Sequence, residues 1–199
     1  MSDIFPELSA EDRQDIAWMQ CVRQGDLGAF ERLVEAHQSK VVGVVAKMLG
    51  DVSDAEDIAQ QVFLRVWNSA ARYEPSARFT TWLFTITRNL AFNELRRRKR
   101  HPAVSLDSEL GGRAFQVQDA HAKSAPKVMM EEEMQASIQK AIDALPQAQR
   151  MAVILRRYQD VSYEEIGNIL EMSVPAVKSV LFRARTTLRE CLRDYLNEG

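Results

Sequence analysis

The sequence has few of the residues that build disulfide frameworks, tight turns or metal sites. Its two cysteines, Cys21 and Cys191, lie far apart without ligand spacing, so we expect reduced thiols, with a redox-sensing pair as the minor alternative. Eight glycines and six prolines are too few for a loop-rich or disordered chain. The three histidines, His37, His101 and His121, lie outside any nucleophile, metal or phosphate-loop motif. We therefore expect a helical, globular protein that is not an enzyme and uses no cofactor or metal.

A long apolar run and the apolar core of a signal peptide are also missing from the sequence. We therefore expect a soluble, cytoplasmic protein without membrane insertion. The composition is 46% hydrophobic and 27% charged, and 199 residues suffice for one domain or two small ones.

The charges are nearly balanced in number but unevenly distributed. The formal net charge is −2, which by itself argues against a nucleic-acid-binding protein. Residues 61–100, however, contain nine basic and two acidic residues, a net charge of +7. Acidic residues gather instead within 3–15, 51–57 and 131–133. A chain with charges separated in this way can bind DNA with one face and a basic protein surface with another.

Residues 161–189 have the pattern of two short helices joined by a tight turn. Ser162 and Glu165 have the spacing of a capping box, which satisfies free N–H groups at a helix start. Ser173 is a second N-cap candidate, and Pro175 falls in the first turn of the next helix, where its missing N–H costs little. The pattern predicts a helix-turn-helix.

The second helix of this pair combines an apolar stripe with a basic remainder. Val177, Leu181, Ala184 and Leu188 recur at helical spacing. Lysine and arginine side chains on the other faces can neutralise phosphates and read base edges in the major groove. The alternative is a plain helical hairpin with a solvated basic face. We favour DNA binding because the caps and the placement of the charges agree.

The remaining periodicity predicts an all-α protein of two small helical domains joined by a flexible linker, the second domain containing the helix-turn-helix. Residues 1–15 are expected to form a loose N-terminal arm that turns helical from Glu11, and 16–100 the first domain. Pro, Gly, Ser, Asp and Gln replace the apolar pattern over the linker, 101–127. Residues 128–199 form the second domain.

Two segments of the first domain have informative patterns. Ser53 and Glu56 have capping-box spacing at a helix start. A long helix from Phe79 toward Arg100 has two apolar stripes, so we expect neighbours on two sides. The valines of 41–45 would suit a strand, but their helical surroundings favour a helix.

Several motifs, taken in their order and spacing, resemble those of one protein family. In the first domain they are DAEDIAQQVFLRVW (54–67), TWL (81–83) and RNLA (88–91). In the second they are ALP (144–146) with Arg150, SYEEI (162–166), VKS (177–179) and FRAR (182–185). Over about residues 16–100 and 130–193 the chain resembles an extracytoplasmic-function sigma factor, the smallest type of bacterial transcription-initiation sigma factor.

The resemblance implies a subunit that binds core RNA polymerase through the helix beginning at Asp54. The implied polymerase contacts are Asp54, Asp57, Gln60, Gln61 and Arg65. Gln61 replaces the family's usual glutamate, which puts one charged contact in doubt. Without the resemblance, a helix with an acidic, solvated start would be the preferred interpretation.

The resemblance also implies that the first domain opens the −10 element and traps a flipped base. Unstacking a base costs roughly a few kcal/mol, which pocket hydrogen bonds and stacking on rings such as Tyr73 or Phe79 can recover. The implied −10 residues are Tyr73, Ser76, Phe79, Thr80, Arg88, Asn89, Asn93, Arg96 and Arg97, with Asn89 reading the base. The arginines would hold phosphates, although the run 96–100 also suits a solvated helix end that complements the helix dipole. Trp82 is interpreted as a core residue.

The second domain is implied to read the −35 element as duplex DNA. The implied contacts are Lys178, Ser179, Phe182, Arg183, Arg185 and Thr186. Val180 stands where many family members have arginine, so one contact is either missing or replaced by apolar contact with a thymine methyl.

The implied partners are core RNA polymerase, promoter DNA (duplex at −35, single-stranded at −10) and, as in many relatives, an anti-sigma factor held between the domains. Two other classes stay open on the residues alone. A DNA-binding repressor would share the helix-turn-helix but does not need the motif at 54–67. A helical protein-binding adaptor would share the apolar faces but gains nothing from the +7 segment.

Overall fold

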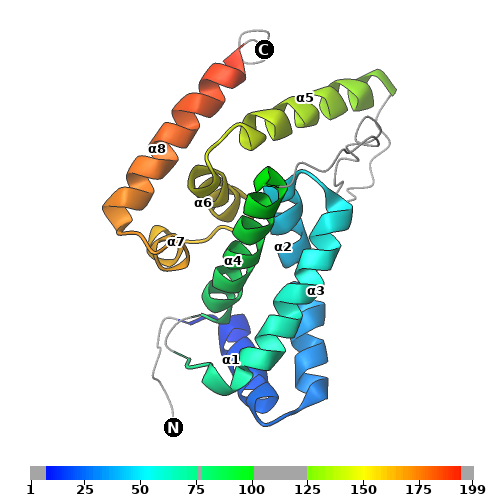
Figure 1. Cartoon of the computed structure of the whole chain (residues 1–199), viewed down its shortest axis with the longest axis vertical. Helices are drawn as coiled ribbons and strands as arrows, with labels where there is room; N and C mark the ends of the chain where they lie inside the picture. Colours follow the sequence, from blue (N-terminus) through cyan, green and yellow to red (C-terminus); the bar gives the residue numbers. More distant parts are fainter. Residues whose placement is uncertain (1–7, 76–77, 101–124, 194–199) are drawn as a thin grey trace.

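The computed structural model describes residues 8–75, 78–100 and 125–193, with 125–133 described by the backbone alone. All regular elements in this part of the chain are helical, as expected (Figure 1). They are α1 (Ala10–Arg23), α2 (Leu27–Leu49), α3 (Val52–Ser69), the short 3-10 helix η1 (Ala70–Arg72), α4 (Phe79–Arg100), α5 (Ala125–Asp143), α6 (Gln147–Tyr158), α7 (Tyr163–Leu170) and α8 (Val174–Cys191). We call α1–α4 with η1 the first lobe and α5–α8 the second lobe.

The first helix begins earlier than its apolar pattern indicates. Ser9 and Asp12 form a complete capping box, in which the Ser9 hydroxyl accepts from the Asp12 N–H and the Asp12 carboxylate accepts from the Ser9 N–H, each at 3.1 Å. The helix therefore starts at Ala10, and the expectation of a loose arm through residue 15 is wrong for 10–15.

The corner between α2 and α3 is built by a glycine and an aspartate. Gly50 ends α2 with a φ of 73°, the left-handed conformation that glycine adopts without strain. Asp51 then caps α3 by accepting from the Ser53 N–H at 2.8 Å and from the N–H of the next residue. The predicted capping box of Ser53 and Glu56 does not form, because the helix already starts at Val52.

Helix α4 lies between the two lobes and has an apolar stripe for each (Figure 1). Phe79 and Leu83 are buried in the core of the first lobe, and Trp82 packs against the same core, which confirms its interpretation as a core residue. Phe84 and Ala91 belong instead to the core of the second lobe. The prediction of neighbours on two sides is therefore confirmed.

Helix α2 is shared between the lobes in the same way. Val41 and Val45 are buried in the first core, whereas Val44 and Met48 are buried in the second. A helix that is buried on two faces needs apolar residues on both of them. This explains the run of valines at 41–45, which would also have suited a strand. The two lobes are thus packed directly against each other through a shared apolar core.

The helix-turn-helix forms as predicted. Ser162 and Glu165 make a complete capping box at α7, and the Ser173 hydroxyl accepts from the Ala176 N–H at 3.4 Å at the start of α8. A Cβ atom on Gly167 would lie 2.7 Å from the carbonyl oxygen of Met172, so this position requires glycine. The tight turn between the helices therefore depends on one residue without a side chain.

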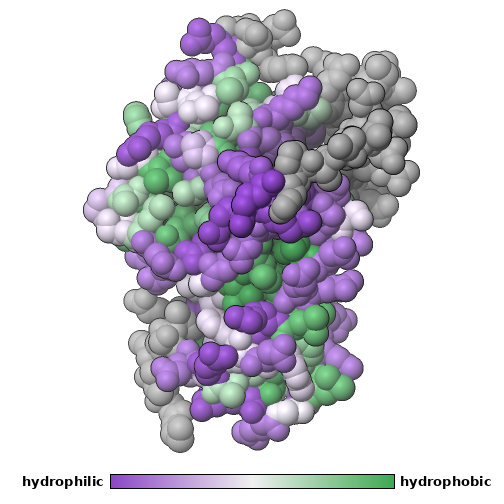
Figure 2. Space-filling view, viewed as in Figure 1, coloured by the Kyte–Doolittle hydropathy of each residue, from purple (hydrophilic) through white to green (hydrophobic). Residues whose placement is uncertain are grey.

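Most of the surface shown in Figure 2 is hydrophilic, interrupted by apolar patches that include the area where α3 and α4 meet in Figure 1. No helix in the described segments is both long and apolar enough to cross a membrane.

Candidate nucleic-acid interface

The outer face of α8 is exposed along its length. Val177, Leu181 and Ala184 anchor the helix in the core, and Val180 packs against the same core, so the polar side chains between them face solvent. The exposed set includes each predicted −35 residue: Lys178, Ser179, Phe182, Arg183, Arg185 and Thr186. Phe182 is 70% exposed, which is unusual for a large apolar ring.

The two hydroxyl groups on this face already have partners in their own helix. The Ser179 hydroxyl donates to the carbonyl of Pro175 at 3.0 Å, and the Thr186 hydroxyl donates to that of Phe182 at 3.2 Å. Their oxygens therefore keep lone pairs for base or water donors, and Lys178 and Arg183 are exposed on the same helix.

A groove of about 680 Å³ lies between α6 and α8, behind this face. It has an apolar part, made by Val153, Leu181 and Leu188, and a basic rim. The rim contains Arg156, Arg157 and Arg185, with one acidic residue, Asp160. The groove is therefore both apolar and positively charged.

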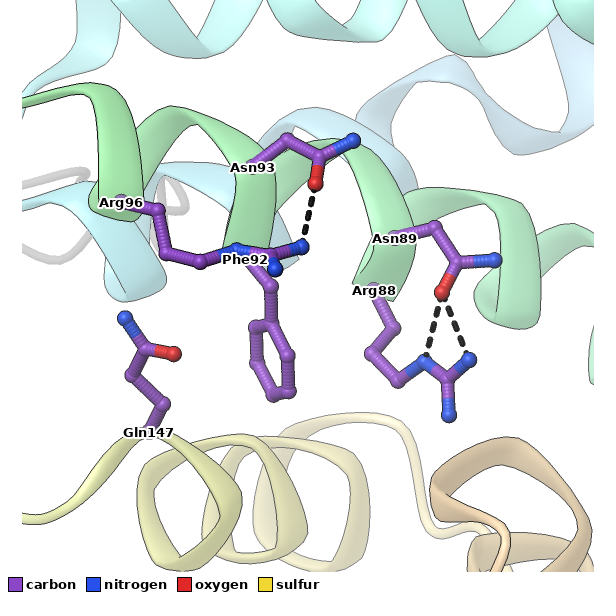
Figure 3. Close-up of a pocket in the computed structure, with 6 residues that line it drawn as sticks. All are labelled: Arg88, Asn89, Phe92, Asn93, Arg96 and Gln147. Carbon is purple, nitrogen blue, oxygen red and sulfur yellow. Dashed lines mark hydrogen bonds between the residues drawn. The ribbon is translucent and has the colours of Figure 1, made fainter.

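A second hollow, of about 580 Å³, opens along α4 (Figure 3). It is lined by Arg88, Asn89, Phe92, Asn93 and Arg96 of α4, and by Gln147 at the start of α6. The structure thus brings together four of the predicted −10 residues. Phe92 and Gln147 were missed, because an apolar position and a residue of the other domain gave no signal in the sequence.

Arg88 organises this hollow. It donates from Nε and Nη2 to Oδ1 of Asn89 at 3.0 and 2.6 Å (Figure 3). Its Nη2 also donates to a carboxylate oxygen of Glu171 at 2.8 Å. The Arg88 side chain is only 11% exposed, whereas Asn89 is exposed. The guanidinium and amide groups that line the hollow together provide hydrogen-bond donors for phosphates and base edges.

The aromatic residues predicted to stack on a base lie in the core. Tyr73 is 2% exposed and Phe79 fully buried, so neither ring has a free face in this structure. Burial, with a smaller contribution from Asp15, raises the pKa of Tyr73 to about 12. Thr80 is partly exposed, and Ser76 lies outside the described residues.

The basic end of α4 is not a simple row of free cations. Arg98 pairs with Glu94 and Asp54 and donates to the carbonyl of Leu49 at 3.0 Å, so it fixes α4 to the corner between α2 and α3. Arg97 donates to Glu94 at 2.7 Å, and this hydrogen bond is the main reason why the pKa of Glu94 lies below its usual range. Arg96 contacts Asn93 and faces the hollow.

Helix α3 presents the predicted polymerase contacts on one outer face. Asp57, Gln60, Gln61 and Arg65 are exposed, whereas Asp54 is partly covered and paired with Arg98. Leu64 lies among them and is 61% exposed. Sequence reasoning missed Leu64, although an apolar residue outside the buried stripe of α3 was the available signal.

The fold is that of an all-helical, two-lobed protein with a helix-turn-helix, and comparison with known proteins defines its family. Residues 33–101 match the model of sigma-70 region 2, and residues 135–188 match the model of sigma-70 region 4. The RNA polymerase sigma-H factor of Pseudomonas aeruginosa is 31% identical over 188 residues, covering 94% of this chain and 97% of the relative. The ECF RNA polymerase sigma factor SigW of Bacillus subtilis is 33% identical over 177 residues, covering 87% and 94%.

A solved structure is similar over the same range. The sigma factor RpoE of Bartonella quintana, in complex with the anti-sigma factor NepR, matches with a TM-score of 0.62 and 25% identity, covering 82% of this chain and 96% of that one. The chain belongs to the extracytoplasmic-function sigma factors, the subunits that bind core RNA polymerase and direct it to promoter DNA. Membership in this family excludes the two alternative classes, a DNA-binding repressor and a helical protein-binding adaptor.

Proposed function

We propose that the chain makes its contacts through three separate surfaces: the outer face of α3 for core polymerase, the hollow along α4 for the −10 element, and the outer face of α8 for the −35 element. The main support for this proposal is that all the residues of α8 predicted to contact the −35 element are exposed. An exposed phenylalanine between cations suits a partner that offers both methyl groups and phosphates, as duplex DNA does.

On α8, the residues near its N-terminus are assigned to base edges. Helix-turn-helix proteins place the first part of the recognition helix in the major groove, which selects Lys178, Ser179 and Phe182. Arg183 is assigned to a base or phosphate, and Arg185 to the backbone. These assignments make the affinity fall with added salt, because each neutralised phosphate releases counterions.

In the hollow along α4, Asn89 is assigned to the flipped base and Arg88 and Arg96 to phosphates. Phe92 is the aromatic ring that lines this hollow, so we assign the stacking role to Phe92. Tyr73 and Phe79 lie in the core of the first lobe and do not line this hollow. This revises which ring contacts DNA and keeps, of the predicted −10 residues, those on α4 that line the hollow.

On α3, Asp57, Gln60, Gln61 and Arg65 are assigned to polymerase, with Leu64 as the apolar centre of the contact. An exposed leucine within a polar rim is the usual composition of a protein interface. Asp54 is instead assigned a structural role, since its carboxylate already pairs with Arg98.

Control by an anti-sigma factor is supported by the complex of RpoE with NepR and by the groove between α6 and α8. Its apolar floor and arginine rim suit an amphipathic helix with acidic residues. We further propose that the chain acts in the cytoplasm, where polymerase works, and performs no catalysis of its own.

The test is transcription by purified chain and core polymerase on a library of cognate genomic promoters. The expected result is a set of transcripts whose start sites share one −10 and one −35 sequence and that core polymerase alone does not make. Leu64→Glu should weaken polymerase binding without changing duplex binding by the free chain, while Leu27→Glu, at another exposed leucine, serves as its control. Absence of promoter-specific transcripts would overturn the proposal.

A further inference from the structure

Both asparagines in the hollow along α4 hold their side-chain oxygen against an arginine of the same helix (Figure 3). Oδ1 of Asn89 accepts from Nε and Nη2 of Arg88 at 3.0 and 2.6 Å. Oδ1 of Asn93 accepts from Nη2 of Arg96 at 2.5 Å. In Figure 3 both amide nitrogens point away from these arginines. Each asparagine therefore presents its NH2 group.

The chemistry of the guanidinium sets this orientation. An arginine cannot accept a hydrogen bond, so only the oxygen of a side-chain amide can face its N–H groups. Turning the Asn89 amide over would place its two N–H donors against those of Arg88. The amide oxygen has two lone pairs, and the two hydrogen bonds from Arg88 use both of them. Asn89 therefore faces the hollow as a hydrogen-bond donor only.

The Arg88 guanidinium is itself held in place. Its Nη2 donates a further hydrogen bond to Glu171 at 2.8 Å, and the side chain is only 11% exposed. Asn89 is exposed, and the terminal torsion of an asparagine is broad, so without a partner this amide could present either of its atoms. The two hydrogen bonds between Arg88 and Asn89 are internal to α4, so they do not need the second lobe.

We propose that Arg88 is a positioning residue for base selection: by occupying the oxygen of Asn89, it makes this residue read hydrogen-bond acceptors on the flipped base and reject adenine. The inference rests on the proposed role of the hollow along α4. Asparagine recognises adenine with both atoms of its amide, the oxygen accepting from N6 and the nitrogen donating to N7. With its oxygen occupied, Asn89 cannot make the first of these hydrogen bonds.

The other bases do not need that oxygen. Guanine offers two neighbouring acceptors, N7 and O6, and the pyrimidines offer O2, so an NH2 group can donate to each of them. Adenine would meet the same NH2 group with its N6 donor left unpaired, and an unpaired polar group costs binding free energy. The orientation of one amide thus separates adenine from the other three bases.

This role leaves part of Arg88 free for phosphate. Nη1 makes no hydrogen bond to the residues that the structure describes. The guanidinium therefore fixes the base-reading group with its Nε and Nη2 edge and can meet the DNA backbone with Nη1.

The first measurement follows the Asn89 amide in the full chain without polymerase or DNA. The heteronuclear NOE of its side-chain NH2 signal, which is assigned by its loss in Asn89→Ala, reports motion on the ps–ns timescale. The amide should be rigid in the wild type and mobile in Arg88→Met. Arg96→Met is the matched control, because Arg96 holds Asn93 instead. It should release the Asn93 amide and leave that of Asn89 rigid.

The second measurement is base preference at the −10 position where Asn89→Ala loses selectivity. Four templates that differ only at this base compete in one transcription reaction with core polymerase. The wild type should use the adenine template least. Arg88→Met should raise its use relative to the other three about fivefold, the low end of what one bidentate base contact discriminates. Arg96→Met should leave this ratio unchanged.

The ratio separates positioning from phosphate binding, because the loss of a phosphate contact weakens all four templates alike. Arg88→Lys, which keeps the charge but loses the two-donor edge, tests the same ratio if Arg88→Met is unstable. Melting temperatures confirm that each variant is folded.

A mobile Asn89 amide in the wild type would overturn the proposal, as would a base ratio that Asn89→Ala alters and Arg88→Met does not. Either result leaves the proposed function of the hollow standing. Conversely, if the chain gives no promoter-specific transcripts, the proposed function falls, while the NOE measurement still decides whether Arg88 orients Asn89.

Discussion

Arg150 of α6 donates from Nη1 to the carbonyl of Met48, the second-last residue of α2, at 2.7 Å, although 102 residues separate them in the chain. The same guanidinium contacts the carbonyl and carboxylate of Asp143 at the end of α5. Burial lowers the pKa of Arg150 and raises that of Asp143, each opposed by the attraction between them. One side chain therefore satisfies helix ends in both lobes.

Arg150→Ala should destabilise the protein by about 1–3 kcal/mol, because it leaves helix-end carbonyls without donors. Urea unfolding measures the loss. Arg157→Ala, at an exposed arginine of the same helix, should change stability by less than about 0.5 kcal/mol. Equal stability of the two variants would show that water replaces the arginine without cost.

Gly167→Ala should lower the melting temperature, because its Cβ would lie 2.7 Å from the Met172 carbonyl oxygen. The matched change is Gly43→Ala within α2, where nothing lies within 4 Å of the new Cβ. That change should stabilise by about 0.5–1 kcal/mol through helix propensity. A rise in melting temperature for both variants would contradict the close approach in the turn.

Tyr73→Phe should leave stability at neutral pH within about 1 kcal/mol of wild type, because the buried hydroxyl has no hydrogen-bond partner among the described residues. The folded pKa of about 12 lies above the usual 10.0, so the contribution of Tyr73 to stability is fully present below pH 10 and is lost as the pH rises toward 12. Denaturation at several alkaline pH values should show that loss reduced in Tyr73→Phe and unchanged in Tyr158→Phe, at an exposed tyrosine.

Arg183→Ala should weaken binding of −35 duplex by about tenfold, the order expected for one base or phosphate contact. Fluorescence anisotropy at fixed salt measures it with promoter fragments identified by transcription. Arg189→Ala, an exposed arginine in the last turn of α8, is the control and should change the affinity less than threefold, roughly what a single screened charge contributes. Similar losses of affinity in both variants would mean that α8 contributes only nonspecific positive charge to DNA binding.

Asn89→Ala should chiefly impair selection at −10, so that promoters with a changed base there are used about as well as the parent sequence. Competing promoter templates in one transcription reaction measure this ratio. Asn68→Ala, at an exposed asparagine at the end of α3, should keep the wild-type ratio. An unchanged ratio in Asn89→Ala would move base reading to another residue of the hollow.

Much of the helix-turn-helix could be predicted locally. A capping box joins residues three apart, so Ser162 and Glu165 identify the start of α7 without knowledge of the rest of the fold. The same rule predicted a box at Ser53 that does not form, because Asp51 reaches the free N–H groups first. Local patterns predict that a cap is needed, and competition between neighbouring residues decides which one supplies it.

The aromatic residues were harder to assign. An aromatic ring looks the same in sequence whether it lies in a core or faces a base, so Tyr73 and Phe79 were placed at the DNA and Phe92 was not considered. Three-dimensional packing separates them: the first two rings contact each other edge to face with centroids 6.2 Å apart in the core, and Phe92 lines the hollow.

The sequence by itself determined the helices, their caps, the two apolar stripes of α4 and the basic outer face of α8, because each depends on residues a few positions apart. Only the tertiary structure decided what those stripes pack against and which charges meet. Glu171 and Arg88 are 83 residues apart. Their pairing depends on how one lobe sits on the other, which is set by the shape of the shared core and leaves no periodic trace in the chain.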